Sequence, residues 1–575
     1  MRNCCKTVAL LLWLVPLSPA APATETFVVG GSGGGLSWEE AAGSAPVIDF
    51  AARPGWVQPR NVAENTNISL ETYARGGQVT SPNAHTVLRL NRVALGDTLK
   101  NIFDGNHQTA FEVKNVAATG ILLVIDLGAR FGVNHIRFFP RSSFPDDFMK
   151  GYVLSINDGL FGAEIIEASS IKLPDKTLFS QIAQDGSNTR ATIDVRFPLQ
   201  YVRYIRLEST QRFNWEIDEL EIFGRGFVPE ATYLSQVFDF DQAALWGRLS
   251  WADEQQGLPE KSRFAISTRS GSSLSPTDEP ANWSPWSSPY ASSNSRIVSP
   301  APRRYFQFKV DFESDGLEDG VALDSLAFEV SRPALAESIV GEIWPQDVPV
   351  GVDTTFTYAI RVVNARGFDR LEIDTPAPVR MVQSVRLDDV ELDFEAEDET
   401  RGLRLNFASQ TGTRLLEVVF DTAVLRYETV FNGRLFDRRA ETLPQEIEGG
   451  NVAASLPGDD LSVRVPLRGE LVHRLEVSPN PFTPNGDGIN DRTIVTYDLL
   501  YLIRTVPVSL KVYDLAGNQV ADLPLEAAAS GRHLHAWDGR DADGRLLPPG
   551  LYVVQVEAQT GGGAERRSAT VAIAY

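Results

Sequence analysis

Cysteine is almost absent from this chain. Only Cys4 and Cys5 occur in 575 residues, and both precede the apolar run 8–15. A basic start, that run and the small residues at 21–23 predict a signal peptide over residues 1–23. The mature chain would then have no disulfide. Because secreted eukaryotic proteins of this length usually carry disulfides, we expect a bacterial exported protein.

Long apolar runs and excess positive charge are also missing. No later segment is apolar over the ~20 residues that a bilayer requires, so we expect no transmembrane segment. Lysine and arginine number 53 against 75 acidic residues, for a net charge of −22. Such a surface repels phosphate backbones and makes nucleic acid an unsuitable partner. The six histidines show no zinc-ligand spacing. The predicted signal peptide and the lack of a later apolar run together predict a secreted or cell-surface location.

Helical periodicity is nearly absent, whereas alternation of apolar and polar residues is widespread. Phe306, Phe308, Val310 and Phe312 alternate with polar residues, and the stretch 356–362 does the same. A period of two with one apolar face is typical of half-buried antiparallel strands. Frequent Gly and Pro favour short turns between them. The sequence therefore predicts an all-β chain of tandem β-sandwiches.

Changes in composition predict the domain boundaries. A Gly-rich tether is expected at 24–44, followed by sandwiches at 45–226, 228–332, 333–470 and 471–575. The second sandwich has no feature that indicates an activity. The third is acidic and rich in strands, which favours an immunoglobulin-like spacer.

Four segments in the first sandwich occur in a characteristic order. They are an Asp-Gly turn in 101–111, an apolar strand with Asp-Leu-Gly in 121–139, an alternating strand at 201–208 and the closing segment 215–224. This order resembles the discoidin family, the coagulation-factor C-type or galactose-binding-like domain. The resemblance covers 45–226 and implies a jelly-roll sandwich. Its members bind sugars, lipids or proteins through loops at one end, which implies recognition rather than catalysis.

The last sandwich carries a second resemblance. Its segments are 477–482, 483–491, the strand 508–517, the Asp-rich turn 537–544 and the strand 549–556. They are similar to the immunoglobulin-like domain of the flagellar hook-capping protein family. Related modules end large exported bacterial proteins and serve as sorting or attachment signals. The resemblance implies bacterial secretion or attachment machinery as a partner.

The Asp104-Gly105-Asn106 turn is the best candidate metal site. The discoidin resemblance implies a structural Ca²⁺ held by this turn and by a Glu of the last strand, since hard oxygen ligands suit that ion. Carried over by position, the ligands are Asp104, Asn106, Thr109 and Glu219. The alternative is an Asx-Gly turn without an ion.

Three further motifs are better explained as turns or linkers. The run 485–491 resembles the start of a Ca²⁺ loop but has Ile489 at a ligand position and no closing Glu. The aspartates of 538–543 favour a hairpin turn. Gly30-Gly-Ser-Gly-Gly34 matches the nucleophile-elbow pattern, but the chain lacks the βαβ alternation of a hydrolase sheet.

Ligand contacts are expected from aromatic and donor side chains near one end of the first sandwich. Sugars stack their apolar faces on exposed rings, while polar neighbours bind the hydroxyl groups. The candidates are Trp215, Arg141, Phe144 and His107. The alternative for Trp215 is that it packs beneath the final strand, because Trp is usually highly buried.

These features together predict an exported, non-enzymatic binding or adhesion protein. The first sandwich would recognise glycans or another cell-surface ligand, and the last would serve sorting or attachment. One alternative is an extracellular glycoside hydrolase with its catalytic unit in 228–470, which would need two carboxylates ~5–10 Å apart in a cleft. Another is a purely structural surface component.

Overall fold

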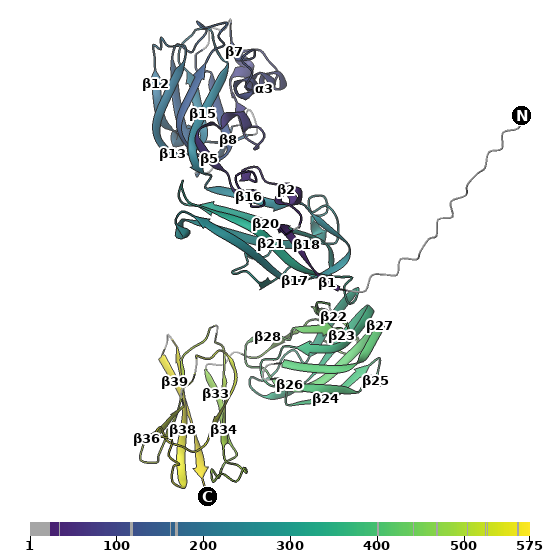
Figure 1. Ribbon diagram of the computed structural model, residues 1–575. Helices are drawn as coiled ribbons and strands as arrows, with labels where there is room; N and C mark the ends of the chain where they lie inside the picture. The colour runs from purple at the N-terminus through teal and green to yellow at the C-terminus, as the bar shows by residue number, and fades with distance from the viewer. Residues whose placement is uncertain are drawn as a thin grey trace, which may run out of the picture. The chain divides into compact units, whose positions relative to one another are not determined.

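The chain consists mainly of antiparallel β-strands, which confirms the predicted fold class (Figure 1). A computed structural model describes residues 23–575 except 34, 115–118, 161–162, 167–170, 400–401, 441, 467–469, 503, 524, 526 and 561–562. The predicted signal peptide therefore lies almost wholly outside the described residues. The chain forms two compact units, one of Glu25–Asp241 with Trp246–Val330 and one of Ser331–Tyr575 with Gln242–Leu245.

The first sandwich has a seven-stranded sheet in the order β12-β9-β13-β8-β15-β5, with β6 paired to β8, and a separate ladder of β7 and β14. Its strands are β5 (Asn61–Asn67), β6 (Gln78–Thr80), β7 (Phe111–Val113), β8 (Leu122–Phe139), β9 (Tyr152–Asn157), β10 (Ala163–Ile166), β11 (Ile171–Pro174), β12 (Ser180–Asp185), β13 (Ile193–Ser209), β14 (Trp215–Ile217) and β15 (Glu219–Phe227). Its helical turns are η1 (Ser69–Glu71), α2 (Ala84–Val87), α3 (Arg92–Lys100), η2 (Asn101–Phe103) and η3 (Lys176–Leu178).

The central strands of this sheet are held in register by apolar cross-strand pairs. Leu123 and Ile125 of β8 lie opposite Leu207 and Ile205 of β13, and all four are fully buried. Directly opposed apolar side chains stabilise an antiparallel pair and oppose a slip by one residue, which would expose the whole set. The sheet therefore provides a fixed base for the loops at its ends.

The second sandwich follows the strand order β1-β21-β17-β20-β16-β2, with β18 paired to β20 and β19 to β17. Its elements are β1 (Ala23–Gly30), α1 (Trp38–Ala41), β2 (Ala42–Ser44), β3 (Ile48–Asp49), β4 (Gln58–Pro59), β16 (Glu230–Ser235), β17 (Phe238–Gln256), η4 (Pro259–Lys261), β18 (Ser262–Gly271), η5 (Pro280–Asn282), β19 (Ser295–Arg296), β20 (Arg303–Ser314) and β21 (Gly320–Arg332).

The predicted tether at 24–44 is wrong, because these residues belong to the second sandwich. Phe27 of β1 packs 5.1 Å from Phe328, centroid to centroid. Trp38 is buried, and its indole N–H donates to the carbonyl of Asp324 at 2.9 Å. Gly30 has φ +78°, and a Cβ there would come within 2.0 Å of the Trp38 ring. Glycine is thus required here for close packing and a left-handed backbone, not for flexibility.

The predicted start of the first sandwich at residue 45 is also too early. Val57 forms a two-way backbone bridge with Leu323 of β21, in the second sandwich. The first strand of the seven-stranded sheet begins only at Asn61. The chain therefore enters the second sandwich, leaves it to build the first, and returns at β16.

The third sandwich has the order β25-β24-β27-β23-β22-β31, with β26 paired to β27, β29 paired to β23 and β30, and a separate β28–β32 ladder. Its strands are β22 (Ser338–Trp344), β23 (Asp353–Ile373), β24 (Met381–Leu387), β25 (Val390–Glu391), β26 (Phe394–Glu399), β27 (Gly402–Ala423), β28 (Glu428–Val430), β29 (Gly433–Phe436), β30 (Gln445–Glu446), β31 (Glu448–Gly449) and β32 (Ser462–Arg464).

The last sandwich pairs a three-stranded sheet, β33-β34-β37, with a four-stranded sheet, β36-β35-β38-β39. Its strands are β33 (Val472–Ser478), β34 (Thr493–Leu499), β35 (Val508–Tyr513), β36 (Gln519–Leu523), β37 (Gly531–Trp537), β38 (Gly550–Thr560) and β39 (Gly563–Ile573). A core that includes Phe482, Tyr497, Trp537 and Val554 fills the space between the two sheets.

Candidate ligand-binding surface

One face of the β7–β14 ladder carries a group of charged side chains around Glu216, whose own side chain is fully buried. Phe111 and Val113 of β7 are buried, and so are Trp215 and Ile217 of β14. Because side chains alternate along a strand, the residues between them project to the opposite face. These residues are Glu112 and Glu216, which lie directly opposite each other in register.

Two carboxylates in direct cross-strand contact repel each other unless cations compensate. Arg141 supplies the first cation. Its Nε donates to Oε1 of Glu216 at 2.9 Å and its Nη2 to Oε2 at 2.7 Å, while its backbone N–H also donates to Oε1 at 3.0 Å. The same Nη2 donates to Glu112. Such bidentate, charge-assisted contacts fix the guanidinium in one orientation.

Lys114 supplies the second cation. Its Nζ lies 3.2 Å from Oε2 of Glu216 and 3.6 Å from carboxylate oxygens of both Glu112 and Asp147. The backbone of Asp147 is held in place as well, since its carbonyl accepts from the N–H of Glu216 at 2.8 Å. The loop that follows β8 is thereby tied to β14.

These contacts set the protonation of the group. Burial alone would raise the pKa of Glu216, but hydrogen bonds from Arg141 and Lys114 outweigh it and the pKa is lowered. The pKa of Arg141 is raised, chiefly by its hydrogen bond to Glu216. Burial opposes charge on Lys114, yet the carboxylates around it raise its pKa. Glu216, Arg141 and Lys114 therefore stay charged near neutral pH.

Phe144 places an aromatic ring on this charged surface. Its side chain is 43% exposed. The Lys114 Nζ lies 4.2 Å from the ring centroid and the Arg141 Cζ lies 4.8 Å from it. Cations near an aromatic face are attracted by the ring quadrupole. The result is an exposed ring bordered by fixed donors and acceptors, an arrangement that suits a ligand with one apolar face and several hydroxyl groups.

Two of the four predicted contact residues, Arg141 and Phe144, come together here. A third, His107, has a side chain that is 64% exposed, and its Nδ1 lies 2.9 Å from Oδ2 of Asp218. The hydrogen bond to Asp218 is the main cause of its raised pKa. Trp215 is only 1% exposed and packs against Phe111 with the ring centroids 5.7 Å apart. This burial contradicts the predicted ligand contact, because a sugar stacks only on a ring face that solvent reaches.

The sequence reasoning missed Glu112, Lys114, Asp147 and Glu216. The signal for two of them was present, since Glu112 and Glu216 occupy the polar positions of short alternating segments. Their meeting depends on the pairing of strands more than 100 residues apart in sequence. Lys114 and Asp147 have no local signature at all.

The predicted calcium turn closes on itself through side-chain hydrogen bonds. Asp104 accepts from the Asn106 N–H at 2.8 Å and from the Thr109 hydroxyl at 2.7 Å. The Thr109 hydroxyl also contacts the Asn106 carbonyl at 2.9 Å. The structure thus brings together the three predicted ligands of the turn, with their oxygen atoms within one short loop.

Glu219, the fourth predicted ligand, is the strongest sign that an ion fits. It is 2% exposed, and neither carboxylate oxygen has a hydrogen-bond partner of normal geometry. Burial is the main cause of a pKa raised to about 7; the nearby Gly105 N–H opposes the shift and the charge of Asp104 adds to it. A buried carboxylate without a donor is costly unless a cation compensates it. The residues present therefore fit a hard cation bound by oxygen atoms.

The other motifs behave as turns. In 485–491, the two carboxylate oxygens of Asp491 accept from the N–H groups of Gly486 and Gly488 at 2.6 and 2.7 Å. The carboxylate of Asp541 likewise accepts from the backbone N–H groups of Asp543 and Arg545 within its own hairpin. Across the described residues, no group of three or more His, Cys, Asp or Glu side chains is arranged to hold a metal ion. A calcium site at Glu219 would accordingly depend on hydroxyl and carbonyl oxygens as well.

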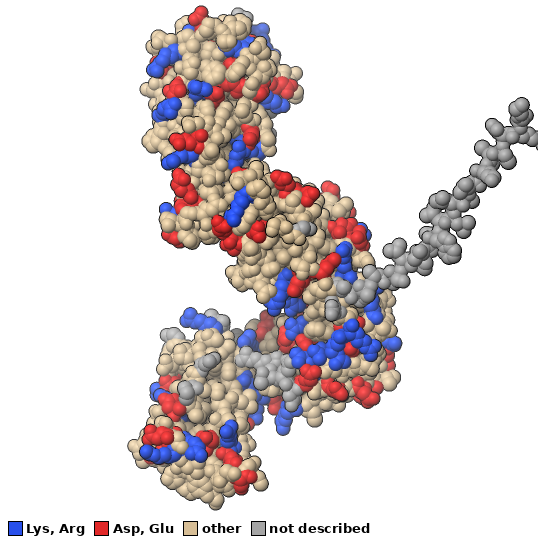
Figure 2. All heavy atoms as spheres, in the orientation of Figure 1, with Lys and Arg blue, Asp and Glu red and all other residues tan. Residues whose placement is uncertain are grey.

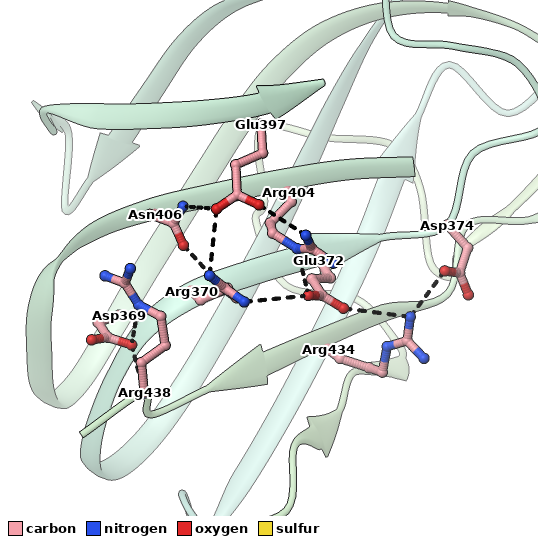
Figure 3. A network of polar contacts seen from close by, with 9 residues as sticks. All are labelled: Asp369, Arg370, Glu372, Asp374, Glu397, Arg404, Asn406, Arg434 and Arg438. Atoms are coloured by element: carbon pink, nitrogen blue, oxygen red, sulfur yellow. Dashed lines mark hydrogen bonds and ion pairs between the residues drawn. The ribbon is translucent and has the colours of Figure 1, made fainter. Parts of the chain in front are cut away.

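The third sandwich presents a ladder of alternating charges across four strands (Figure 3). Glu397 of β26 contacts Arg404 of β27, Arg404 contacts Glu372 of β23, and Glu372 contacts Arg434 of β29. Two of the acidic side chains of this sandwich, Glu372 and Glu397, are thus paired with arginines from neighbouring strands. Acidic and basic side chains also lie interspersed on the face shown in Figure 2.

A groove of about 460 Å³ lies beside this ladder, lined by Asp393, Phe394, Glu395, Asn406, Phe407, Ala408 and Arg438. Both of its carboxylates are exposed. A glycosidase acid needs a buried setting that raises its pKa. The groove therefore offers no particular support for a hydrolase.

One family model matches the C-terminal part of the chain. Residues 500–562 match the FlgD Ig-like domain, which confirms the hook-capping-protein-like immunoglobulin-like domain at the C-terminus. No curated protein matches the chain. In the described part of the chain, no helix has the length and apolar character needed to cross a membrane.

Among solved structures, three carbohydrate-binding modules illustrate the likeness. CpGH89CBM32-5 from Clostridium perfringens, in complex with GalNAc-β-1,3-galactose, is 14% identical with a TM-score of 0.20, over 28% of this chain and 100% of that chain. Chitosan-binding module 1 from a Paenibacillus sp. IK-5 chitosanase/glucanase is 12% identical, with a TM-score of 0.20 and coverage of 28% and 100%. The family 32 module of C. perfringens NanJ, in complex with galactose, is 18% identical, with a TM-score of 0.17 and coverage of 21% and 82%. At these identities and TM-scores, the likeness does not indicate what this chain binds.

Proposed function

We propose that this chain is an exported, non-enzymatic protein that binds glycans through its first sandwich. The observation that carries the proposal is the exposed Phe144 ring, bordered by Lys114 and Arg141, which are fixed by carboxylates of the β7–β14 ladder and its neighbouring loop. Pre-oriented polar groups around an aromatic surface lower the entropy cost of binding a polyhydroxylated ligand. Adhesion to a glycan-bearing cell surface would be the biological use of such a site.

A neutral glycan fits this surface better than an acidic one. Glu112, Asp147 and Glu216 outnumber the two cations, Arg141 and Lys114, and those cations are already paired with them. A sulfate or carboxylate on the ligand would have to compete with these fixed carboxylates. Hydroxyl groups, in contrast, can accept from the cations and donate to Glu112 and Asp147, the two carboxylates that solvent reaches.

A structural Ca²⁺ held by Asp104, Asn106, Thr109 and Glu219 would stiffen the same end of the sandwich. The unpartnered, buried carboxylate of Glu219 supports this part of the proposal. When bound, the ion would supply the positive charge that this carboxylate lacks. Glu219 follows β14 after a single residue, so its position affects the ladder that carries Glu216.

We further propose that the C-terminal immunoglobulin-like domain serves sorting or attachment, through bacterial secretion or anchoring machinery, and that the middle sandwiches act as spacers. The FlgD Ig-like match supports a module of that kind. A secreted or cell-surface location is part of the same proposal.

A glycan array probed with the full-length chain, the Phe144→Ala variant and a Tyr427→Ala control tests the binding function. Tyr427 is a comparably exposed aromatic residue, 50% exposed, in the third sandwich. We expect selective hits on neutral glycans that Phe144→Ala loses and Tyr427→Ala keeps. Equal binding by all three proteins would refute the site. An absence of hits, together with hydrolysis of glycans by the full chain, would favour the alternative of an enzyme in 228–470.

A further inference from the structure

β18 of the second sandwich is sealed along one edge by a segment without regular secondary structure. The strand pairs with β20 along one edge. Along the other edge run residues 283–290, which we name the strap. The strap N–H groups of Ser284, Ser287 and Tyr290 donate to carbonyls of β18 at 2.9, 2.9 and 3.0 Å. The edge groups of the strand are thereby paired without a further strand.

The strap N–H groups that donate to β18 recur every three residues, which is the period of a polyproline II helix. Ser284 and Ser287 make two contacts each with β18. The hydroxyl of Ser284 accepts from the Ser270 N–H at 3.2 Å, and that of Ser287 accepts from the Thr268 N–H at 3.1 Å. Each serine therefore satisfies both a donor and an acceptor of β18. Tyr290 adds a third fastening, with its hydroxyl 2.6 Å from the Thr268 Oγ1.

A stack of rings and cations clamps the strap from the face of the sheet. Arg269 of β18 lies with its Cζ 5.2 Å from the Trp283 ring centroid and 4.4 Å from that of Trp286. The Lys309 Nζ of β20 lies 5.7 Å from the Trp286 ring. Arg269 is itself fixed by two hydrogen bonds that its guanidinium donates to the side-chain Oε1 of Gln307, at 2.9 and 2.5 Å.

We propose that the strap is a built-in guard of the β18 edge, held closed by this stack, and that opening it lets two copies of the chain pair through β18. An unpaired strand edge is a template for another strand. β18 is ten residues long, Ser262–Gly271, which is sufficient for a strand-to-strand interface. Two identical antiparallel edges can pair about a two-fold axis, so a second copy is the partner that the geometry favours.

The test uses the full-length protein and the Trp286→Ala variant, which removes the ring that lies near both cations. Trp286→Phe keeps an aromatic ring and serves as the conservative variant. Trp56→Ala is the matched control, since it removes a ring that stacks on Arg53 in the same sandwich at 3.3 Å, away from the strap. Hydrogen exchange of β18 peptides and light scattering are measured in dilute and concentrated solution.

In dilute solution, we expect β18 amides of Trp286→Ala to exchange about tenfold faster or more, while Trp286→Phe and Trp56→Ala behave like the parent. In concentrated solution, Trp286→Ala should form dimers and its β18 amides should regain protection. Unchanged hydrogen exchange of β18 in Trp286→Ala would overturn the proposal that the stack holds the strap closed. Dimers that leave β18 unprotected would overturn pairing through this edge, and so would faster exchange spread evenly over the sandwich. If Trp286→Ala fails to fold, Arg269→Lys, which keeps the charge but loses the planar stack, must show the same local effect or the proposal fails.

Discussion

Replacing Glu219 by Gln removes a buried carboxylate that the protein alone does not stabilise. Its pKa is raised from an ordinary 4.5 to about 7, mainly by burial. The gap between these values corresponds to about 3 kcal/mol of unfavourable free energy for the charged form in the folded state. Gln has nearly the same shape and no charge. We therefore expect Glu219→Gln to stabilise the first sandwich when calcium is absent.

The stability difference between Glu219→Gln and the parent depends on pH. Because the folded-state pKa lies above the unfolded one, the contribution of Glu219 to the stability of the parent protein is fully present below about pH 4.5 and is lost as the pH rises through about 7. With chelator at about pH 8, the variant should exceed the parent by up to about 3 kcal/mol, or roughly 6–12 °C in melting temperature for a domain of this size. At about pH 4.5 the two should be nearly equal.

Calcium should remove most of the difference between the parent and Glu219→Gln. At a concentration 100 times its dissociation constant, an ion that binds only the folded state adds about 2.7 kcal/mol to the parent. Glu219→Gln should gain much less. Urea unfolding of the full-length chain, monitored by hydrogen exchange of first-sandwich peptides, measures the stability of both proteins with chelator and with calcium. Glu221→Gln is the control on the same strand, since Glu221 is paired with Arg137.

Two results would refute this reasoning. If Glu219→Gln is less stable than the parent in chelator at about pH 8, the carboxylate must have favourable partners. If both proteins gain equally from calcium, Glu219 is not a ligand.

Three further predictions concern other parts of the chain. Glu216→Ala should cost about 3 kcal/mol of unfolding free energy, measured in urea, because it leaves two cations without their buried carboxylate; a loss under about 1 kcal/mol would count against a buried pair. Trp38→Ala should cost about 3–5 kcal/mol in the second sandwich, whereas a residue in a free tether would cost almost nothing. Burial lowers the pKa of His535, with the neighbouring His533 adding to the effect. The contribution of His535 to the stability of the last sandwich should therefore be full above pH ~6.5 and decline as the pH falls towards the lower folded-state pKa. Hydrogen exchange of last-sandwich peptides, measured as a function of pH, should show this loss of stability in the parent and not in His535→Gln.

Local pattern in the sequence was sufficient to predict the strands. The alternation of Phe306, Phe308 and Phe312 with polar residues places one face of β20 in a core, because strand geometry repeats every two residues whatever the neighbours. The order of turns and strands in 101–224 and 477–556 was likewise readable, as was the Asp104 turn. These features depend on residues close together in the chain.

Tertiary structure decided which of those residues form a site. Glu112 and Glu216 meet because β7 and β14 pair in one register, and Lys114 and Arg141 reach them from separate loops. The burial of Trp215 and the tight turn at Gly30 depend equally on distant partners. Sequence alone determined a string of β-sandwiches and the turns between their strands, since backbone geometry and turn chemistry are local. The charged surface, the carboxylate of Glu219 and the closure of the tether into a strand were fixed only by contacts between segments far apart in the chain, whose energies appear only when the strands are in register.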